Sequence, residues 1–257
     1  MLANYHTHTP RCQHADGTER EYTEHAISQG FTVLGFSDHV PQPFPDDFVS
    51  HIRMSMDELP GYIDTLLRLR DEYKDSIELL IGFEVEYTRK YFDRLMTILR
   101  QYPVDYIIQG QHNIPDEPDG FYAGNRTDDE ERLKDYVDYT IEGMRTGLFT
   151  YLAHPDLINF TGSDDTYRKH MVRIIEASVE LGIPLEINMY GFLGGRNYPC
   201  DSFFSMASEM GASFVIGCDA HFPKDVRQPE NLHGFTDFLK RNGIKWGDNI
   251  IELRSIL

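Results

Sequence analysis

Histidine is unevenly placed in this chain, since seven of its eleven histidines lie at or just after short apolar runs typical of β-strands. Two carboxylates occupy similar places. The nine residues are His6, His8, His14, His39, Glu84, His112, His154, Asp219 and His221. Imidazole and carboxylate are the usual protein ligands of zinc, iron and manganese. Nine such groups exceed what one ion binds, so the pattern predicts a cluster of two or three metals with hydrolytic chemistry.

The other four histidines differ in position. His25 and His170 fall within predicted helices, His51 lies in a polar loop, and His233 lies in the C-terminal region. A single histidine is more often a hydrogen-bonded or surface side chain than a ligand. That explanation suits these four, to which we assign no ligand role, but it does not suit seven histidines at strand ends.

Apolar runs alternate with amphipathic stretches along the chain, which predicts parallel strands connected by helices. The predicted strands are 2–8, 32–37, 78–85, 106–111, 151–154, 184–189 and 213–218. The predicted helices lie near 19–29, 56–73, 90–100, 129–146, 164–181, 202–210 and 228–242. Helix stop signals are expected at Gly30, Gly182, Gly211 and Gly243.

This α/β pattern fits one domain over residues 1–257, a length that is ordinary for a barrel. A doubly wound open sheet would place its site at one switch point. Polar groups here recur at nearly every strand end, which favours the rim of a closed or nearly closed barrel. Seven strands are predicted, with six or eight left open.

Composition limits the partners of the chain. The net charge of −18 opposes binding to nucleic-acid backbones, but a small anionic substrate stays compatible because bound metals invert the local field. No apolar stretch approaches a membrane span, and the N-terminus shows no secretory signal. Three widely spaced cysteines indicate reduced thiols and a cytoplasmic protein. The oligomeric state is open.

The spacing within the motifs supports shared ligation. His6 and His8 are two apart on a predicted strand, so both imidazoles point to one face, and Asp219 and His221 repeat that spacing. Glu84 is the preferred central acid because it directly ends an apolar run. Glu86 shares its face and is expected to be a supporting or solvated acid.

Three further acids have two readings each. Asp16 precedes a glycine and is either a turn residue or a partner that orients a ligand histidine. Asp38 is a weaker candidate for orienting His39, because adjacent strand residues point apart. Asp156, next to the predicted ligand His154, has the same ambiguity.

Two arginines are candidates for substrate binding. Arg196 lies in a glycine-rich loop after the sixth predicted strand, where a guanidinium can clamp phosphate, although an exposed surface role is equally compatible. Arg53 is a weaker candidate. The aromatic residues Tyr190, Phe192 and Tyr198 either wall a pocket or belong to the core.

Taken in order, the motifs HTHT, SDH, GFEVE, GQHN, AHPD and CDAH resemble the polymerase-and-histidinol-phosphatase (PHP) superfamily from His6 to His221. The resemblance implies a distorted (β/α)7 TIM-like barrel with three divalent ions of zinc, iron or manganese. Its three ligand sets would be His6, His8, Glu84 and Asp219; His14, His39 and His221; and Glu84, His112 and His154. Glu84 would bridge, and Glu84, Asp219 and His221 would be the catalytic residues.

Within that superfamily, the chain length and the segment RMSMDELPGYI are most similar to the histidinol-phosphate phosphatase branch. The resemblance implies hydrolysis of L-histidinol phosphate by a metal-bridging hydroxide. An acidic pocket wall would favour the cationic substrate. Two alternatives remain: a phosphoesterase of the same fold acting on nucleotides, oligonucleotides or phosphotyrosine, and a non-catalytic metal-binding protein.

Overall fold

The computed structural model describes residues 1–45 and 47–257, and its strands form a curled parallel sheet. Four strands pair in the order β1-β2-β3-β4, and β7 pairs with β8. Their bounds are β1 Ala3–Asn4, β2 Val33–His39, β3 Glu78–Val85, β4 Tyr106–Gln109, β7 Leu185–Asn188 and β8 Phe214–Gly217. All of these pairings are parallel, as the alternation of strand and helix predicted.

Single bridges join the two groups of strands. Leu152 bridges Gln109 at the end of β4 and Leu185 at the start of β7, while Thr7 bridges Ala220. The predicted strand 151–154 is therefore reduced to one bridging residue, Leu152, because the backbone turns at His154, whose φ is 28°. The predicted strand 2–8 likewise shortens to β1 with a bridge. The arrangement is consistent with a distorted TIM-like barrel.

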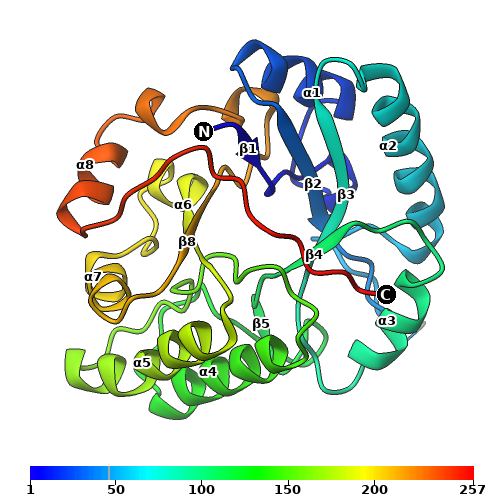
Figure 1. The fold of residues 1–257 in the computed structure, drawn as a ribbon. Helices are drawn as coiled ribbons and strands as arrows, with labels where there is room; N and C mark the ends of the chain where they lie inside the picture. The colour runs from blue at the N-terminus through cyan, green and yellow to red at the C-terminus, as the bar shows by residue number, and fades with distance from the viewer. Residues whose placement is uncertain (46) are drawn as a thin grey trace.

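Six helices follow the predictions within three residues, and the last, predicted near 228–242, begins only at Phe235. All seven lie outside the strands in Figure 1. They are α1 Glu19–Ser28, α2 Leu59–Tyr73, α3 Phe92–Leu99, α4 Glu130–Arg145, α5 Asp164–Leu181, α7 Asp201–Glu209 and α8 Phe235–Arg241. The stop signals are confirmed, since Gly30, Gly182, Gly211 and Gly243 have φ values of 81°, 61°, 80° and 71°. Glycine adopts these angles without a Cβ clash.

Several short elements were not predicted. The helix α6 Met189–Leu193 directly follows β7, and an antiparallel hairpin joins β5 Asn113–Ile114 to β6 Phe121–Tyr122. The 3₁₀ helices are η1 Pro10–Cys12, η2 Met56–Glu58, η3 Pro223–Asp225 and η4 Pro229–Asn231. Their hydrophobic runs are too short to show a helical or strand period.

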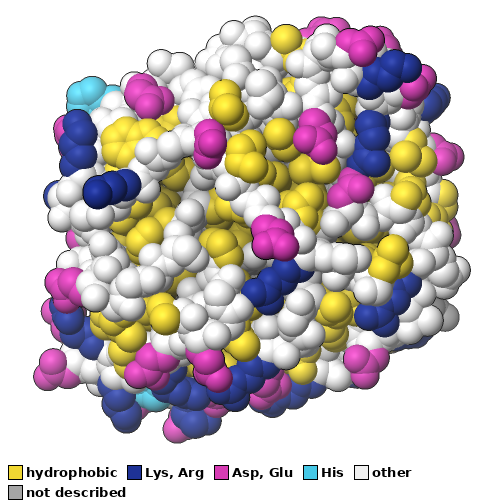
Figure 2. Space-filling view, in the orientation of Figure 1, with side chains coloured by type: hydrophobic (Ala, Val, Ile, Leu, Met, Phe, Trp, Pro, Cys, Tyr) yellow, Lys and Arg dark blue, Asp and Glu magenta, His cyan; other side chains and the backbone are white. Residues whose placement is uncertain are grey.

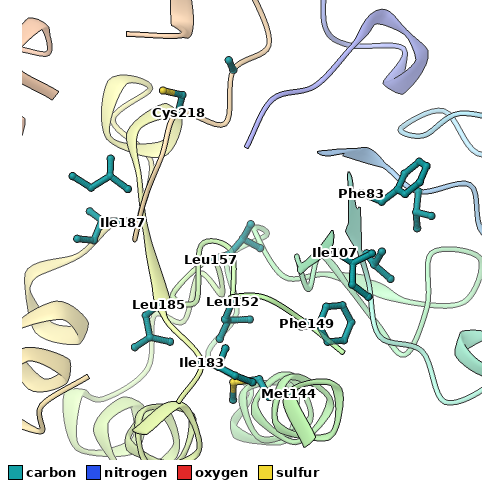
Figure 3. Packing of buried hydrophobic residues seen from close by; sticks show 14 of the residues in the cluster. Phe83, Ile107, Met144, Phe149, Leu152, Leu157, Ile183, Leu185, Ile187 and Cys218 are labelled. Carbon is teal, nitrogen blue, oxygen red and sulfur yellow. The ribbon is translucent and has the colours of Figure 1, made fainter. Parts of the chain in front are cut away.

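Apolar residues fill two layers. The inner cluster takes side chains from several strands, including Tyr5, Leu80, Tyr106 and Val215. The larger outer cluster lies between the strands and the helices, and Figure 3 shows part of it, with Phe149, Leu152 and Ile183 grouped near Met144 of α4. These layers hold the carboxyl ends of the strands together at one edge of the sheet.

The C-terminal stretch runs across the strands in Figure 1. Asn249 Nδ2 donates to the carbonyls of Ala3 and Ile216 at 3.0 and 2.9 Å, and Ile251 and Leu253 pack on the inner cluster. In the space-filling view of the same face, histidine is visible only in small patches at the outer edge of the molecule (Figure 2). The described part of the chain has no helix of the length and apolarity that crossing a membrane requires.

Candidate metal centre and active site

All nine predicted ligands come together at one place. A cavity of about 440 Å³ has eight of them in its wall, and the ninth, His6, is fully buried beneath. The eight are His8, His14, His39, Glu84, His112, His154, Asp219 and His221. Residues more than 200 positions apart therefore share one neighbourhood. The four histidines given no ligand role are absent from the described residues that line this cavity.

Glu84, at the end of β3, lies in the middle of the group. Its Oε1 is 2.7 Å from Nε2 of His154 and 3.5 Å from Nε2 of His112. Its Oε2 is 3.0 Å from Nδ1 of His39 and 3.6 Å from Nε2 of His6, yet it has no hydrogen-bond partner within the described residues. A buried carboxylate that faces imidazoles on both oxygens is suited to bridging two cations.

Asp219 completes a second group. Its Oδ1 is 2.9 Å from Nε2 of His8 and 3.5 Å from Nε2 of His6, and those two nitrogens are 3.2 Å apart. Among the described atoms, Oδ1 of Asp219 is also buried without a hydrogen bond. Buried polar atoms normally have a partner, and convergent lone pairs with none are suited to a cation.

His14, His39 and His221 form a third group, whose ligand atoms lie within 4.8 Å of one another. Their ring centroids are 4.9 Å apart for His14 and His221, and 5.4 Å apart for His14 and His39. His14 is exposed while the other two are buried. This group therefore lies nearest to solvent.

Buried carboxylates hold the far nitrogens of two histidines. Nδ1 of His6 donates to Oε1 of Glu186 at 2.7 Å, and Nδ1 of His8 lies 3.4 Å from Oδ1 of Asp38. A proton fixed on Nδ1 leaves the lone pair of Nε2 toward the cluster. Asp38 thus orients His8 rather than its neighbour His39.

Backbone carbonyls do the same for two others. Nδ1 of His221 donates to the carbonyl of Asp219 at 2.9 Å, and Nδ1 of His14 donates to the carbonyl of Cys12 at 2.6 Å. Both imidazoles therefore present Nε2 to the cavity. Asp219 itself has a φ of 49°, an uncommon angle for a residue with a Cβ, of the kind that concentrates at functional sites.

Glu186 on β7 is the main residue that the sequence reasoning missed. Besides holding His6, its Oε2 accepts from the backbone N of His154 at 3.0 Å and from Asn188 Nδ2 at 2.9 Å. A Cβ at Gly217 on β8 would collide with its carboxylate, so that glycine makes room for it. The available signal was an acid inside an apolar strand, two residues before Asn188.

Arg53 is not placed as a direct substrate contact would require. It is 2% exposed and is not among the described residues that line the cavity. Its Nε donates to Glu117 at 2.7 Å and its Nη2 donates to Glu86 at 3.1 Å. Glu86 in turn lies 3.2 Å from Nδ1 of His112, without the alignment of a hydrogen bond, so Arg53 supports the wall behind His112.

Arg196 does line the cavity, and its side chain is exposed at the mouth. The guanidinium carbon lies 4.9 Å from the ring centre of Tyr190, which stacks on His221 at 4.6 Å. Tyr190 and Tyr198 are wall residues, as one reading of the sequence expected. Phe192 instead packs against Phe235 and Phe238 of α8, so it belongs to the core.

Asp16 behaves as a turn residue. Its Oδ1 accepts from the N of Gly17 at 2.8 Å, and the side chain is exposed. Its contact with His221 involves only the backbone, where the N of Asp16 donates to the carbonyl of His221 at 2.9 Å. The carboxylate of Asp16 therefore has no hydrogen bond to a described ligand histidine.

Opposite charges at the site shift the pKa values of its members strongly. Burial raises the pKa of the Glu84 carboxyl, but His112, His39 and His6 outweigh it and bring that pKa well below its usual range. Burial lowers the pKa of His6, but Glu186, Asp219 and Glu84 outweigh it and raise that pKa to about 10. The pKa of Asp219 is also well below its usual range, so the ionised form of Glu84 and of Asp219 is favoured. Carboxylates bind metals in that form.

The donor set fits metal ions. Five groups of three His, Cys, Asp or Glu side chains have ligand atoms within 4.8 Å of one another, and eight of the nine predicted ligands take part in them. The two orphaned carboxylate oxygens of Glu84 and Asp219 add to this fit. The residues around the cavity can therefore hold several ions close together.

Known proteins match most of this chain in sequence. A family model described as PHP domain matches residues 4–190. A probable histidinol-phosphatase of Deinococcus radiodurans is 28% identical over 99% of this chain and 94% of the relative. A histidinol-phosphatase of Lactococcus lactis is 24% identical over 93% and 91%.

A solved structure shows the same fold. The crystal structure of histidinol phosphate phosphatase from Lactococcus lactis, complexed with zinc, L-histidinol and phosphate, has a TM-score of 0.74 to this chain. The match covers 98% of both chains at 20% sequence identity. Together with the family model, which spans most of the sequence, these findings show that the chain belongs to the PHP domain family.

Proposed function

We propose that this protein is a cytoplasmic, metal-dependent phosphomonoesterase that hydrolyses L-histidinol phosphate to L-histidinol and phosphate in histidine biosynthesis. The observation that carries the proposal is the convergence of nine metal-type donors at one cavity, whose wall also includes Arg196. Near full-length relatives named histidinol-phosphatase support the choice of substrate. The solved structure with histidinol and phosphate supports it as well.

Three divalent ions of zinc, iron or manganese are the proposed cofactor. The first would be held by His6, His8, Glu84 and Asp219, the second by His14, His39 and His221, and the third by Glu84, His112 and His154. The short distances from Glu84 to members of all three sets support its bridging role. We also propose that residues 1–257 form one phosphoesterase domain with a (β/α)7 barrel. In that barrel the fifth of the seven predicted strands, 151–154, is represented by the bridging residue Leu152.

Bound divalent ions supply two things to phosphate ester hydrolysis: they neutralise phosphate charge and lower the pKa of water from 15.7 toward about 7. The chain's own residues do the rest. The proposed catalytic ligands are Glu84, Asp219 and His221. The carboxylates of Asp38 and Glu186 fix the tautomers of His8 and His6. The side chains of Tyr190 and Tyr198 form part of the cavity wall.

The cavity wall carries groups of both charges that suit the charges of the substrate. Arg196 is the proposed phosphate contact, since a guanidinium matches phosphate oxygens in a fork. Glu117 is the one carboxylate among the described wall residues outside the proposed ligand sets. It is oriented by Ser50 Oγ at 2.8 Å and Arg53 Nε at 2.7 Å, and we assign it to the cationic part of histidinol phosphate.

Other phosphoesters are the main rival substrates. Oligonucleotides would need a basic track, and the chain carries 42 acidic against 24 basic residues. Nucleotides, and phosphotyrosine residues inside a peptide chain, lack the cation that Glu117 suits. A non-catalytic metal site would be closed by four ligands, frequently cysteines, whereas these ligands face an open cavity.

Phosphate release tests the proposal directly. We expect wild-type protein to hydrolyse histidinol phosphate with a kcat/KM at least 100-fold above that for 4-nitrophenyl phosphate, a nucleoside monophosphate or a phosphotyrosine peptide. Glu117→Gln should raise KM for histidinol phosphate about tenfold, because it removes a charged partner, and leave 4-nitrophenyl phosphate unaffected. Glu131→Gln on the exposed side of α4 is the matched control. Equal rates on all substrates would contradict the assignment.

A further inference from the structure

We propose that Asn197 and Asp156 are positioning residues that hold Arg196 at the cavity mouth, an inference that rests on the proposed phosphatase function. Arg196 lies in the loop between α6 and α7, outside any helix or strand. A long exposed side chain on such a loop loses conformational entropy when it binds a ligand, and this loss weakens the binding. Two contacts restrict that mobility by attaching the loop residues Asn197 and Cys200 to the segment that follows His154.

Asn197 makes the first attachment. Its Nδ2 faces three successive carbonyls, those of Asp156, Leu157 and Ile158, at 3.3, 3.0 and 3.4 Å. Although Asn197 is exposed, its amide therefore satisfies a stretch of backbone that has turned away from the sheet. The residue directly after Arg196 is thus fixed to the segment that carries His154 and Leu157 into the cavity.

Asp156 makes the second attachment, at Cys200, three residues after Asn197. It is 1% exposed, and its Oδ2 accepts from the backbone N of Cys200 at 2.7 Å. Cys200 is the N-cap of α7, so this bond fixes the point where the loop enters that helix. Its other oxygen, Oδ1, is buried without a partner among the described residues.

Between the two attachments lies Tyr198, which is 4% exposed and packs its ring 5.7 Å from that of His154. On the other side, the N of Arg196 donates to the carbonyl of Gly191 at 3.0 Å, and a Cβ at Gly191 would collide with the Tyr198 ring. Arg196 is therefore placed from both sides relative to the proposed ligands. The loop residues that these contacts hold, 197–200, include neither the Arg196 guanidinium nor any proposed metal ligand.

A double-mutant cycle tests whether Asn197 acts through Arg196. We expect Asn197→Ala to raise KM for histidinol phosphate, and the inhibition constant of inorganic phosphate, by five- to tenfold, with kcat changed less than twofold. Arg196→Met alone should raise both constants further. In the Arg196→Met background, Asn197→Ala should change them less than twofold, since coupled residues are not additive. Asn231→Ala, another exposed asparagine, is the matched control.

Asp156 is tested by two substitutions. Asp156→Ala removes the acceptor for the Cys200 N and should reproduce the effect of Asn197→Ala, whereas Asp156→Asn keeps an oxygen there and should restore the phosphate inhibition constant to within twofold. Metal content should be unchanged in all of these variants. Additive effects of Asn197→Ala and Arg196→Met would overturn the inference, and so would loss of metal. A wild-type protein without phosphatase activity would instead overturn the proposed function itself.

Discussion

At the scale of single residues, buried carboxylates around the site raise the pKa of two histidines, His6 and His8. His6 is surrounded by Glu186, Asp219 and Glu84, which raise its pKa to about 10 despite burial. His8 is shifted in the same direction, against burial, by Asp219 and Asp38. Both shifts favour protonated imidazole in the metal-free protein, so metal binding is expected to displace a proton.

This state predicts proton release on metal binding. Protein stripped with a chelator and then mixed with Zn²⁺ at pH 8 should release at least one proton per chain, and the apparent affinity should rise with pH up to about 10. The folded pKa of His6 is above its unfolded value of 6.5, so its share of metal-free stability is complete below 6.5 and disappears as pH rises through about 10. Calorimetry in two buffers of different ionisation enthalpy measures the protons. Binding without release would show that the histidines are already neutral.

The ligand residues could be predicted from sequence because each lies at or just after an apolar run. Their supports could not, because Glu186 and Asp38 contact histidines 180 and 30 positions away. Arg53 shows the same limit. Its charge suggested phosphate, yet the fold encloses it between Glu86 and Glu117, a pairing that no local pattern reveals.

At the scale of elements, the strands bring donors together only where small residues leave room. Gly110 follows β4, and a Cβ there would collide with the carboxylate of Glu84 on the neighbouring β3. Gly110 of the GQH motif therefore leaves the space that the side chain of Glu84, in the GFEVE motif, occupies. Short elements such as α6 and the β5–β6 hairpin then place Tyr190 and Tyr122 in the wall.

Gly110→Ala should therefore damage the centre without touching a ligand. We expect a loss of about 1–3 kcal/mol in stability from overpacking, together with weakened metal binding, because Glu84 is buried and cannot move aside. Gly61→Ala in α2 meets no atom within 4 Å and should stabilise the protein by up to about 1 kcal/mol. Chemical denaturation and elemental analysis measure the two effects. Retention of full metal content in Gly110→Ala would contradict this explanation.

At the scale of the whole molecule, the curled parallel sheet explains why distant motifs act together. Parallel strands present their carboxyl ends at one rim, so histidines after β1, β2 and β8 meet those after β4 and Leu152. The order of strands and helices was readable from the sequence because apolar runs alternate with amphipathic stretches. The reduction of one strand to a single bridge was not, because it follows from the turn at His154.

The central claim is that the nine donors form one multinuclear centre on which hydrolysis depends. Elemental analysis of purified protein, combined with turnover of histidinol phosphate, tests it most directly in the wild type and in Asp219→Ala. We predict about three divalent ions per chain in the wild type, fewer in the variant, and a loss of turnover of at least 100-fold. A wild type with one ion or none, or a variant with unchanged metal and turnover, would contradict the claim.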